Sequence, residues 1–367
     1  MRRLLTRRMW WKKLQKWKEL DTYSYEGRLF SVLRNPEQLP DSFADAVETL
    51  HRIDSGHIRI YVTPGWRLFP FLRPKSVNVV VAGSYGRFGN RILELACAHS
   101  LTKVVRAKTL IPQETYPFRL GIHELEDLEV RVAPDAIKKN SLTNLVISFF
   151  RGLRPAIQIR GAMYLAWMEN LGSTSPTPSR ETYKRIGGIV DWPTGQAALP
   201  DNHVVAHIRS GDVFSPPSHP TYGQPPLAFY QKCIKTQQWA KVWVVAEDNR
   251  NPVVDELLLW LKGTGIPYEF HSKGFHADVA LLVAAKNIIA SRGTFVASIV
   301  AAVPHNPNVF FMEQQTLPVQ IENVTEVEDT CGIYSSEVLA DNWEMTGPQL
   351  KLMVTYDESC LSLNVAP

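Results

Sequence analysis

The sequence predicts an α/β protein with a doubly wound sheet, in which helices pack on both faces of largely parallel strands. In the C-terminal half, short apolar runs alternate with helical segments of about ten residues, a pattern that indicates βαβ units. In the N-terminal half, an apolar run leads into a glycine-containing loop and then into a helical segment. At 367 residues, the chain is long enough for two domains with their own hydrophobic cores.

The N-terminal unit begins with an apolar strand predicted over residues 77–82. A helix with one apolar face is expected over 91–102, and a second strand over 104–111. The connecting loop, 83–90, contains three glycines spaced three apart, which matches neither the dinucleotide fingerprint nor the phosphate loop. Two interpretations stay open: a tight turn that needs positive φ, or close approach of the backbone to a ligand, with the Asn90 amide facing a cleft.

The C-terminal half alternates more regularly. Strands are expected over 203–208, 241–246 and 288–290, and helices over 226–237, 253–262, 277–285 and 295–302. A break at 193–202 marks the domain boundary, and the last residues are acidic and irregular. The predicted divisions are a basic amphipathic segment 1–20, a first domain 21–198, a second domain 199–330 and a C-terminal extension 331–367.

The basic charge of the chain is concentrated at its start. The first twenty residues carry eight Lys or Arg and one acid, so the remainder has a net charge of −3 and gives no case for nucleic-acid binding. Trp10, Leu14 and Trp17 share one helical face. This face indicates either peripheral contact with an anionic membrane or a surface helix packed on the body. With no signal-peptide pattern and no long apolar run, a cytoplasmic or membrane-peripheral location is favoured.

The four cysteines show no C-x-x-C spacing, and reduced, buried thiols are the expected state. Cys97 and Cys233 fall in helical segments, while pairing of Cys331 with Cys360 stays open. The sequence also contains no Asp-x-Asp and no His/Cys cluster with ligand spacing, so it predicts no metal site.

Two strand ends in the second half carry residues that suit an anion. His207 and Arg209 share a face at the end of the strand 203–208, with Asp212 close behind. A fixed guanidinium can bind a diphosphate bidentately and stabilise its developing charge; the alternative is a structural Arg–Asp ion pair. The segment from Ser291 to Phe295 follows the next predicted strand and opens a helix. Its hydroxyl and N–H groups suit an anion, or else they only cap the helix.

Three stretches resemble, in order, motifs of the α1,2-fucosyltransferases and of the wider group of GDP-fucose-dependent enzymes with an H-x-R-R-x-D motif. They are Gly86-Arg87-Phe88-Gly89-Asn90-Arg91, Val205 to Asp212, and Asp278 through Phe295. Ser210 stands where the motif has its second Arg, and Arg91 stands where Gln is usual.

The resemblance implies two Rossmann-like domains of the GT-B type with the active site in the interdomain cleft. It implies inverting transfer of fucose from a GDP-fucose donor to a hydroxyl of a glycan acceptor, with no required metal or other cofactor. The alternatives are transfer of another GDP-linked sugar, or binding of sugar nucleotides or glycans without catalysis. The catalytic residues implied are Arg209, Asp212 and His207. The donor-binding residues implied are Gly86, Arg87, Phe88, Gly89, Asn90, Asp278, Ser291, Thr294 and Phe295.

Overall fold

The computed structural model describes residues 58–61, 79–82, 86–105, 107–133, 156–159, 178–194, 197–315, 318–319 and 321–365. The chain divides into two compact units, Met1–Pro178 and Ser179–Pro367, and each is described by itself. The basic segment 1–20 and its Trp10/Leu14/Trp17 face lie outside the described residues. Within the described ranges, no helix combines the length and the apolar character needed to cross a membrane.

The first unit is built on a 6-stranded sheet in the order β1-β6-β2-β3-β5-β4. Its strands are β1 (Ile58–Tyr61), β2 (Val79–Ala82), β3 (Thr109–Pro112), β4 (Gly121–Leu125), β5 (Leu128–Val132) and β6 (Ala156–Ile159). The four central strands are parallel, and β1 and β4 pair antiparallel at the edges. Helix α5 (Phe88–Val105) follows β2 and packs against β2 and β3. Apolar residues of α5 such as Ile92 and Leu93 are fully buried.

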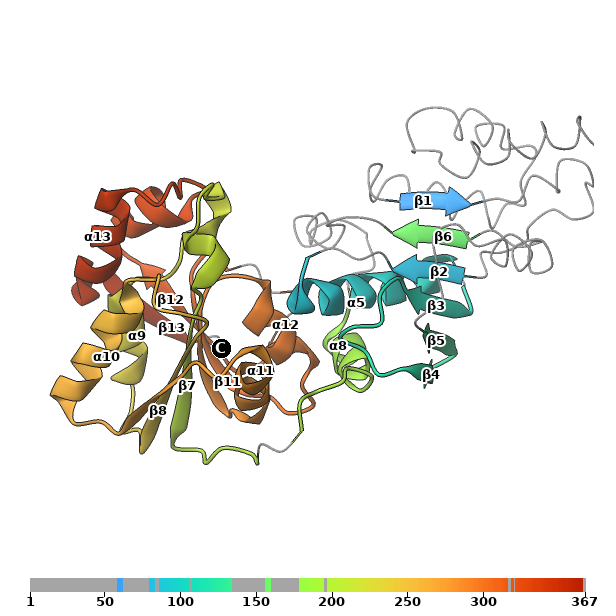
Figure 1. The fold of residues 1–367 in the computed structure, drawn as a ribbon, viewed down its shortest axis with the longest axis horizontal. Helices are drawn as coiled ribbons and strands as arrows, with labels where there is room; N and C mark the ends of the chain where they lie inside the picture. Colours follow the sequence, from blue (N-terminus) through green and yellow to red (C-terminus); the bar gives the residue numbers. More distant parts are fainter. Residues whose placement is uncertain are drawn as a thin grey trace, which may run out of the picture. The chain divides into compact units, whose positions relative to one another are not determined.

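The second unit is built on a 7-stranded sheet in the order β13-β12-β11-β10-β7-β8-β9 (Figure 1). Its strands are β7 (His203–Ile208), β8 (Lys241–Ala246), β9 (Tyr268–His271), β10 (Asn287–Ala290), β11 (Asn308–Met312), β12 (Val324–Asp329) and β13 (Leu361–Val365). Its helices are α8 (Arg180–Gly187), α9 (Leu227–Ile234), α10 (Val253–Thr264), α11 (Phe275–Ala284), α12 (Thr294–Ala302) and α13 (Gly347–Thr355). Only β13 runs antiparallel to its neighbour among these paired strands.

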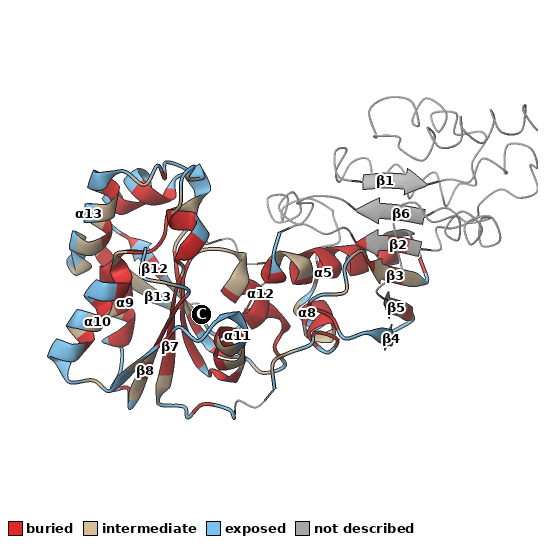
Figure 2. Cartoon of the chain, in the orientation of Figure 1, coloured by how far each residue is buried: buried red, intermediate tan, exposed pale blue. Residues whose placement is uncertain are grey.

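The order of the second sheet contains a switch point between β7 and β10. The chain passes from β7 to β8 and β9 on one side, and then returns to place β10 against the other side of β7. Helices α9 and α10 cover one face, and α11 and α12 cover the other (Figure 1). Because both faces are covered, β7 (Figure 2) and β10 are almost wholly buried, and each contains a run of three apolar residues, 204–206 and 288–290. A doubly wound sheet of this kind binds ligands at the carboxyl ends of the strands that flank the switch point.

The predicted α/β architecture with two Rossmann-like sheets is confirmed. The strands at 203–208 and 241–246 have the predicted bounds. Helix α5 begins at Phe88 rather than 91, so the end of the predicted glycine loop forms its first turn. Strands β9 and β11 were not predicted from the sequence.

The division between the units lies at Pro178 and not near 198. Helix α8, which the sequence analysis assigned to the first domain, packs on α12 of the second unit. Arg180 at the start of α8 donates hydrogen bonds to the carbonyls of Val300 and His305. These contacts join α8 to the second unit in spite of the polar break at 193–202.

The expectation of an irregular C-terminal extension is wrong. Residues 331–367 include a π-helical turn at Ser335–Leu339, helix α13 and strand β13, which completes the second sheet by pairing with β12. Helix α13 begins with a capping box. The Thr346 side chain accepts the backbone N–H of Gln349, and the Gln349 side chain accepts the backbone N–H of Thr346. The extension is therefore part of the second unit's core, and Trp343 within it is fully buried.

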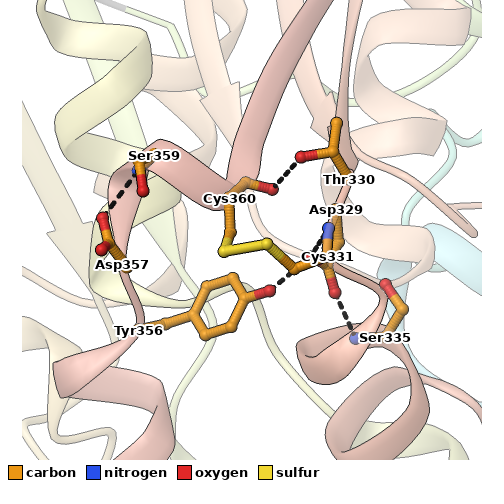
Figure 3. The surroundings of a disulfide bond; sticks show 8 residues. All are labelled: Asp329, Thr330, Cys331, Ser335, Tyr356, Asp357, Ser359 and Cys360. Atoms are coloured by element: carbon orange, nitrogen blue, oxygen red, sulfur yellow. Dashed lines mark hydrogen bonds between the residues drawn. A yellow bond between two sulfur atoms is a disulfide. The ribbon is translucent and has the colours of Figure 1, made fainter.

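A disulfide joins Cys331 to Cys360 across this C-terminal region (Figure 3). The structure thus answers the question of this pairing, which the sequence leaves open, while Cys97 and Cys233 are free and buried. Burial raises the pKa of both free thiols, which keeps them protonated. Beside the disulfide, Asp329 accepts hydrogen bonds from the Tyr356 hydroxyl and from the backbone N–H of Ser335 (Figure 3).

Candidate functional site at the switch point

The carboxyl ends of β7 and β10 bring together the two anion-favouring segments that the sequence places 84 residues apart. His207 Nδ1 lies 2.6 Å from Ser291 Oγ. The guanidinium of Arg209 lies directly against Gly293, where an added Cβ would meet Nη1 at 2.5 Å. The end of β7 and the start of α12 are therefore in direct contact at the switch point.

Arg209 is half-buried and has unengaged hydrogen-bond donors. Its guanidinium carbon lies 4.9 Å from the centre of the Tyr222 ring, and its Nη2 lies 3.8 Å from Asp212 Oδ1. The second distance is too long for a hydrogen bond, so Asp212 attracts the guanidinium without occupying its N–H groups. Within the described residues the guanidinium makes no hydrogen bond. A group with five donors is thus held in place by packing and charge, with those donors available to a ligand.

The start of α12 provides a second centre of positive potential. Gly293 occupies the N-cap with φ of 128° and, as a glycine, has no side chain to cap the helix. The Gly293 N–H donates to Gln315 Oε1 at 2.7 Å. The Ser291 hydroxyl lies beside the His207 ring, 2.6 Å from Nδ1, so the capping interpretation does not apply to this residue. The N–H groups and dipole at an α-helix start favour an anion, and here they adjoin Arg209.

His207 is a neutral residue that orients its neighbours. It is 8% exposed, and its ring lies 5.3 Å from the ring of Phe295. Burial, together with the charge of Arg209, lowers the pKa of His207 to about 3. A neutral imidazole whose conjugate acid is this strong is a poor general base near pH 7. The geometry gives His207 the role of fixing Ser291 at the end of β10.

Asp278 offers a buried acceptor in the first turn of α11. Its Oδ1 lies 3.6 Å from His271 Nε2 at the end of β9, and this oxygen has no hydrogen-bond partner in the described part of the chain. Burial, and then the charge of Glu247, raise the pKa of Asp278 to about 6. Burial lowers the pKa of His271, so that near pH 7 a carboxylate faces a neutral imidazole. Such a carboxylate is suited to accept N–H donors from a ligand.

The loop that carries Arg209 is held by residues that the sequence analysis missed. Ser210 is 2% exposed, and its hydroxyl donates to Asp248. The Asn251 side chain donates to the Arg209 carbonyl at 2.9 Å. Asp248 and Asn251 follow β8, the neighbour of β7, so their position after a strand end was the only signal in the sequence that could have found them.

The Gly86 to Arg91 motif belongs to the first unit, and its contacts are described within that unit. Gly86 has φ of 65°, and the Asn90 amide folds over it so closely that a Cβ would clash. Arg87 is exposed, while Phe88 and Gly89 are buried in the first turn of α5. The positive φ and this close approach support the tight-turn interpretation for Gly86, whereas Gly89 lies within the first turn of α5. Residues 83–85 lie outside the described residues.

Arg91, which stands where the resembled motif has Gln, has a role within the first unit. It forms an ion pair with Glu114 at 2.6 Å and donates to the Tyr116 carbonyl at 3.0 Å. Its guanidinium carbon also lies 5.6 Å from the centre of the Tyr116 ring. These contacts tie the start of α5 to the loop after β3.

The second unit thus combines a guanidinium, a helix start and a buried carboxylate at one edge of its sheet. The first two fit a diphosphate, and the third fits a group with N–H donors. In the described ranges, no three His, Cys, Asp or Glu side chains are grouped as metal ligands.

Comparisons with known proteins give distant structural likenesses. No protein-family model matches the chain, and no curated protein matches its sequence. The α1,6-fucosyltransferase NodZ, in crystals soaked with GDP-fucose, is 11% identical with a TM-score of 0.38, over 79% of this chain and 100% of that one. NodZ from Bradyrhizobium is 12% identical with a TM-score of 0.36, over 69% and 96% of the two chains. A family 9 glycosyl transferase of Veillonella parvula DSM 2008 is 10% identical with a TM-score of 0.37, over 76% and 95%. Likenesses at this level carry no information about substrate.

Proposed function

We propose that the protein is a glycosyltransferase that takes its sugar from a GDP-linked donor and transfers it to a hydroxyl of a glycan acceptor. Fucose is the donor sugar that the sequence motifs favour. One observation carries the proposal: the Arg209 guanidinium, with its donors unengaged, lies against Gly293 at the start of α12. The site can therefore attract the two charged phosphates of a nucleotide sugar without a required metal.

The proposed reaction is a single inverting displacement. The oxygen of the acceptor hydroxyl forms a bond to the anomeric carbon and releases its proton to water. In the same step the bond from that carbon to the diphosphate oxygen breaks, and its electron pair leaves with GDP. Negative charge grows on the diphosphate as the bond breaks. A guanidinium and helix N–H groups fixed beforehand stabilise that charge more in the transition state than in the ground state.

The other site residues are assigned by their surroundings. Asp212 lies 3.8 Å from Arg209 and attracts its guanidinium, so we assign it to orienting Arg209. His207 fixes Ser291, while Thr294 and Phe295 in the first turn of α12 line the diphosphate site. Asp278 accepts N–H groups of the guanine base, and its unpartnered Oδ1 supports this role.

The test is a binding and turnover measurement on the purified full-length protein. GDP affinity is measured by calorimetry with EDTA and with Mg²⁺, and transfer or hydrolysis is then measured with GDP-fucose and with other GDP-sugars. The proposal expects GDP binding that EDTA does not weaken, and turnover of GDP-fucose above the other donors. Absence of GDP binding, or a strict need for Mg²⁺, contradicts it. Tight GDP binding without turnover of any donor identifies a binding protein instead.

A further inference from the structure

We infer that Asn251 is a positioning residue that aims the Arg209 guanidinium at the start of α12. The inference rests on the proposed function, since it concerns how the diphosphate-binding Arg209 is held. Asn251 lies after β8, and nothing in the sequence motifs points to it. It touches the backbone that carries Arg209, and its effect on the ligand is expected to pass through that backbone.

Asn251 is completely buried, and two of its hydrogen bonds join the loop after β8 to the loop after β7. Its Nδ2 donates to the Arg209 carbonyl at 2.9 Å, and its backbone N–H donates to Ser210 Oγ at 3.0 Å. Its Oδ1 accepts the N–H of Val253 at 3.0 Å, at the start of α10. The side chain therefore links the first turn of α10 to the residue that must contact the diphosphate.

Ser210 and Asp248 complete the connection. The Ser210 hydroxyl donates to Asp248, which also accepts the Gly211 N–H at 3.2 Å. Asp248 is in turn ion-paired with Arg250 at 3.0 Å. Hydrogen bonds from this network thus reach residues 209, 210 and 211. They hold the backbone of the residues before and after Ser210. Ser210, which stands where the resembled motif has its second Arg, is buried and its hydroxyl is bonded within this network.

Fixing the backbone at this point fixes the direction of Arg209. The chain turns sharply here, with Gly211 at φ of 66° and the Glu247 carboxylate packed where a Cβ would lie. The guanidinium fits between Tyr222 and Gly293. A rotation of the loop moves it off that position, and a misplacement of about 1 Å at a reacting group can cost about 10²-fold in rate.

Asn287 provides a matched control. It is also a buried asparagine, 5% exposed, that donates to backbone carbonyls near β7. Its bonds, however, go to Asp201 at 2.7 Å and His203 at 3.0 Å, at the opposite end of the strand from Arg209. Asn251→Ala and Asn287→Ala therefore remove comparable buried hydrogen bonds, and only the first loosens the site.

The experiment compares these two variants with Asn251→Asp, Ser210→Ala and Arg209→Ala in the full chain. GDP affinity is measured by calorimetry, and kcat and KM are measured with GDP-fucose. Urea unfolding reports the fraction folded. We expect Asn251→Ala to lower kcat by about tenfold or more and to weaken GDP binding, while Asn287→Ala changes both by less than about twofold. Asn251→Asp keeps the acceptor for Val253 but loses the donor to Arg209, so it should share the loss. Ser210→Ala is the milder variant if Asn251→Ala does not fold.

Coupling to Arg209 separates positioning from general stability. If Asn251 acts through Arg209, the variant Arg209→Ala/Asn251→Ala is no slower than Arg209→Ala alone. Three results would each overturn the inference. The first is additive losses in the double variant, and the second is an equal loss in Asn287→Ala. The third is a folded Asn251→Ala with wild-type kcat and GDP affinity. A different result contradicts the proposed function, namely that Arg209→Ala leaves GDP binding and turnover unchanged. If the wild-type protein binds no GDP, both fail together.

Discussion

The guanidinium of Arg209 lies against the α-carbon of Gly293, at 2.5 Å from the position that a Cβ would occupy. The two residues follow the carboxyl ends of adjacent parallel strands, β7 and β10, at the switch point of the second sheet. This contact places a fixed cation at the start of a helix whose N-cap residue is a glycine without a side chain. Two positive centres at one point explain why an anionic group is the expected ligand.

Replacing Gly293 with alanine is predicted to disrupt this contact. The added methyl displaces the guanidinium, and φ of 128° is unfavourable for alanine. We expect GDP binding to weaken by about tenfold or more, as for the loss of one charge-assisted hydrogen bond, measured by calorimetry. Gly265→Ala is the control, because φ there is 74° but nothing lies within 4 Å of the added methyl. Both variants should lose some stability, and an equal loss of GDP affinity in both contradicts the contact's role.

GDP affinity is predicted to rise as the pH increases from 5 to 7. The pKa of Asp278 is raised to about 6 in the free protein, and only the ionised carboxylate accepts two N–H groups. Below pH 6 the affinity should fall by up to about tenfold per pH unit. Asn at this position does not titrate, so Asp278→Asn should bind GDP more weakly and with a flat profile. An unchanged profile in Asp278→Asn assigns the pH dependence to another group.

Asp278 is also predicted to affect folding stability. Whereas GDP affinity rises with pH, the contribution of Asp278 to stability falls. An unfolded Asp has a pKa of about 3.9, so between that value and about 6 the folded protein holds the proton more tightly. The contribution of Asp278 to the free energy of unfolding therefore decreases as the pH rises through this window. Urea unfolding of wild type and Asp278→Asn from pH 4 to 7 measures it, and a difference between them that is constant with pH argues against the raised pKa.

His207 is predicted to make the fold sensitive to acid. Its pKa is lowered to about 3 in the folded protein, against about 6.5 when unfolded, so the unfolded chain binds the proton first. Its contribution to stability is complete above pH 6.5 and is lost as the pH falls toward 3, at up to about 1.4 kcal/mol per pH unit. His207→Asn removes the titration, and its unfolding free energy should depend less steeply on pH between 6.5 and 4. Parallel slopes for the two proteins would contradict this account of His207.

The disulfide between Cys331 and Cys360 is predicted to stabilise the second unit. It closes a loop with a sequence separation of 29, for which the chain-entropy estimate is about 3–4 kcal/mol. That loop also supports the site, since the Leu339 carbonyl accepts from Arg292 at 2.7 Å and Trp343 donates to Val213 at 3.3 Å. Dithiothreitol should lower the Tm of the wild type to that of Cys331→Ser/Cys360→Ser. The double variant itself should not respond to dithiothreitol, and a wild-type Tm that reduction leaves unchanged contradicts the prediction.

Local sequence patterns predicted the elements that are buried on both faces. Strands β7 and β8 read as continuous apolar runs because helices cover them on both sides. Strand β9 was missed because it lies at the sheet edge, where Tyr268 and Phe270 are partly exposed and alternate with polar residues. Strand β13 was missed because its pairing with β12 depends on the turns and the helix between them, which no local period reports.

The site was predictable only to the extent that strand ends could be located. Arg209 and Ser291 could be placed at strand ends, and the parallel register of β7 and β10 then brings them together. Asn251 and Asp248 could not be assigned, because their bonds to residues 209–211 span 37 to 42 positions and come from a loop without periodicity. The disulfide could not be predicted either, because the spacing of the four cysteines leaves their pairing open.

The central claim is that Arg209 stabilises the departing diphosphate, and the most direct test is the turnover of GDP-fucose by Arg209→Ala and Arg209→Lys at saturating donor. Loss of such a donor typically costs on the order of 10²–10³ in rate, and lysine keeps the charge but lacks the planar fork. We therefore predict that folded Arg209→Ala loses at least about 10² in kcat and that Arg209→Lys is also strongly impaired. A folded Arg209→Ala whose kcat stays within a few-fold of the wild type would contradict the account.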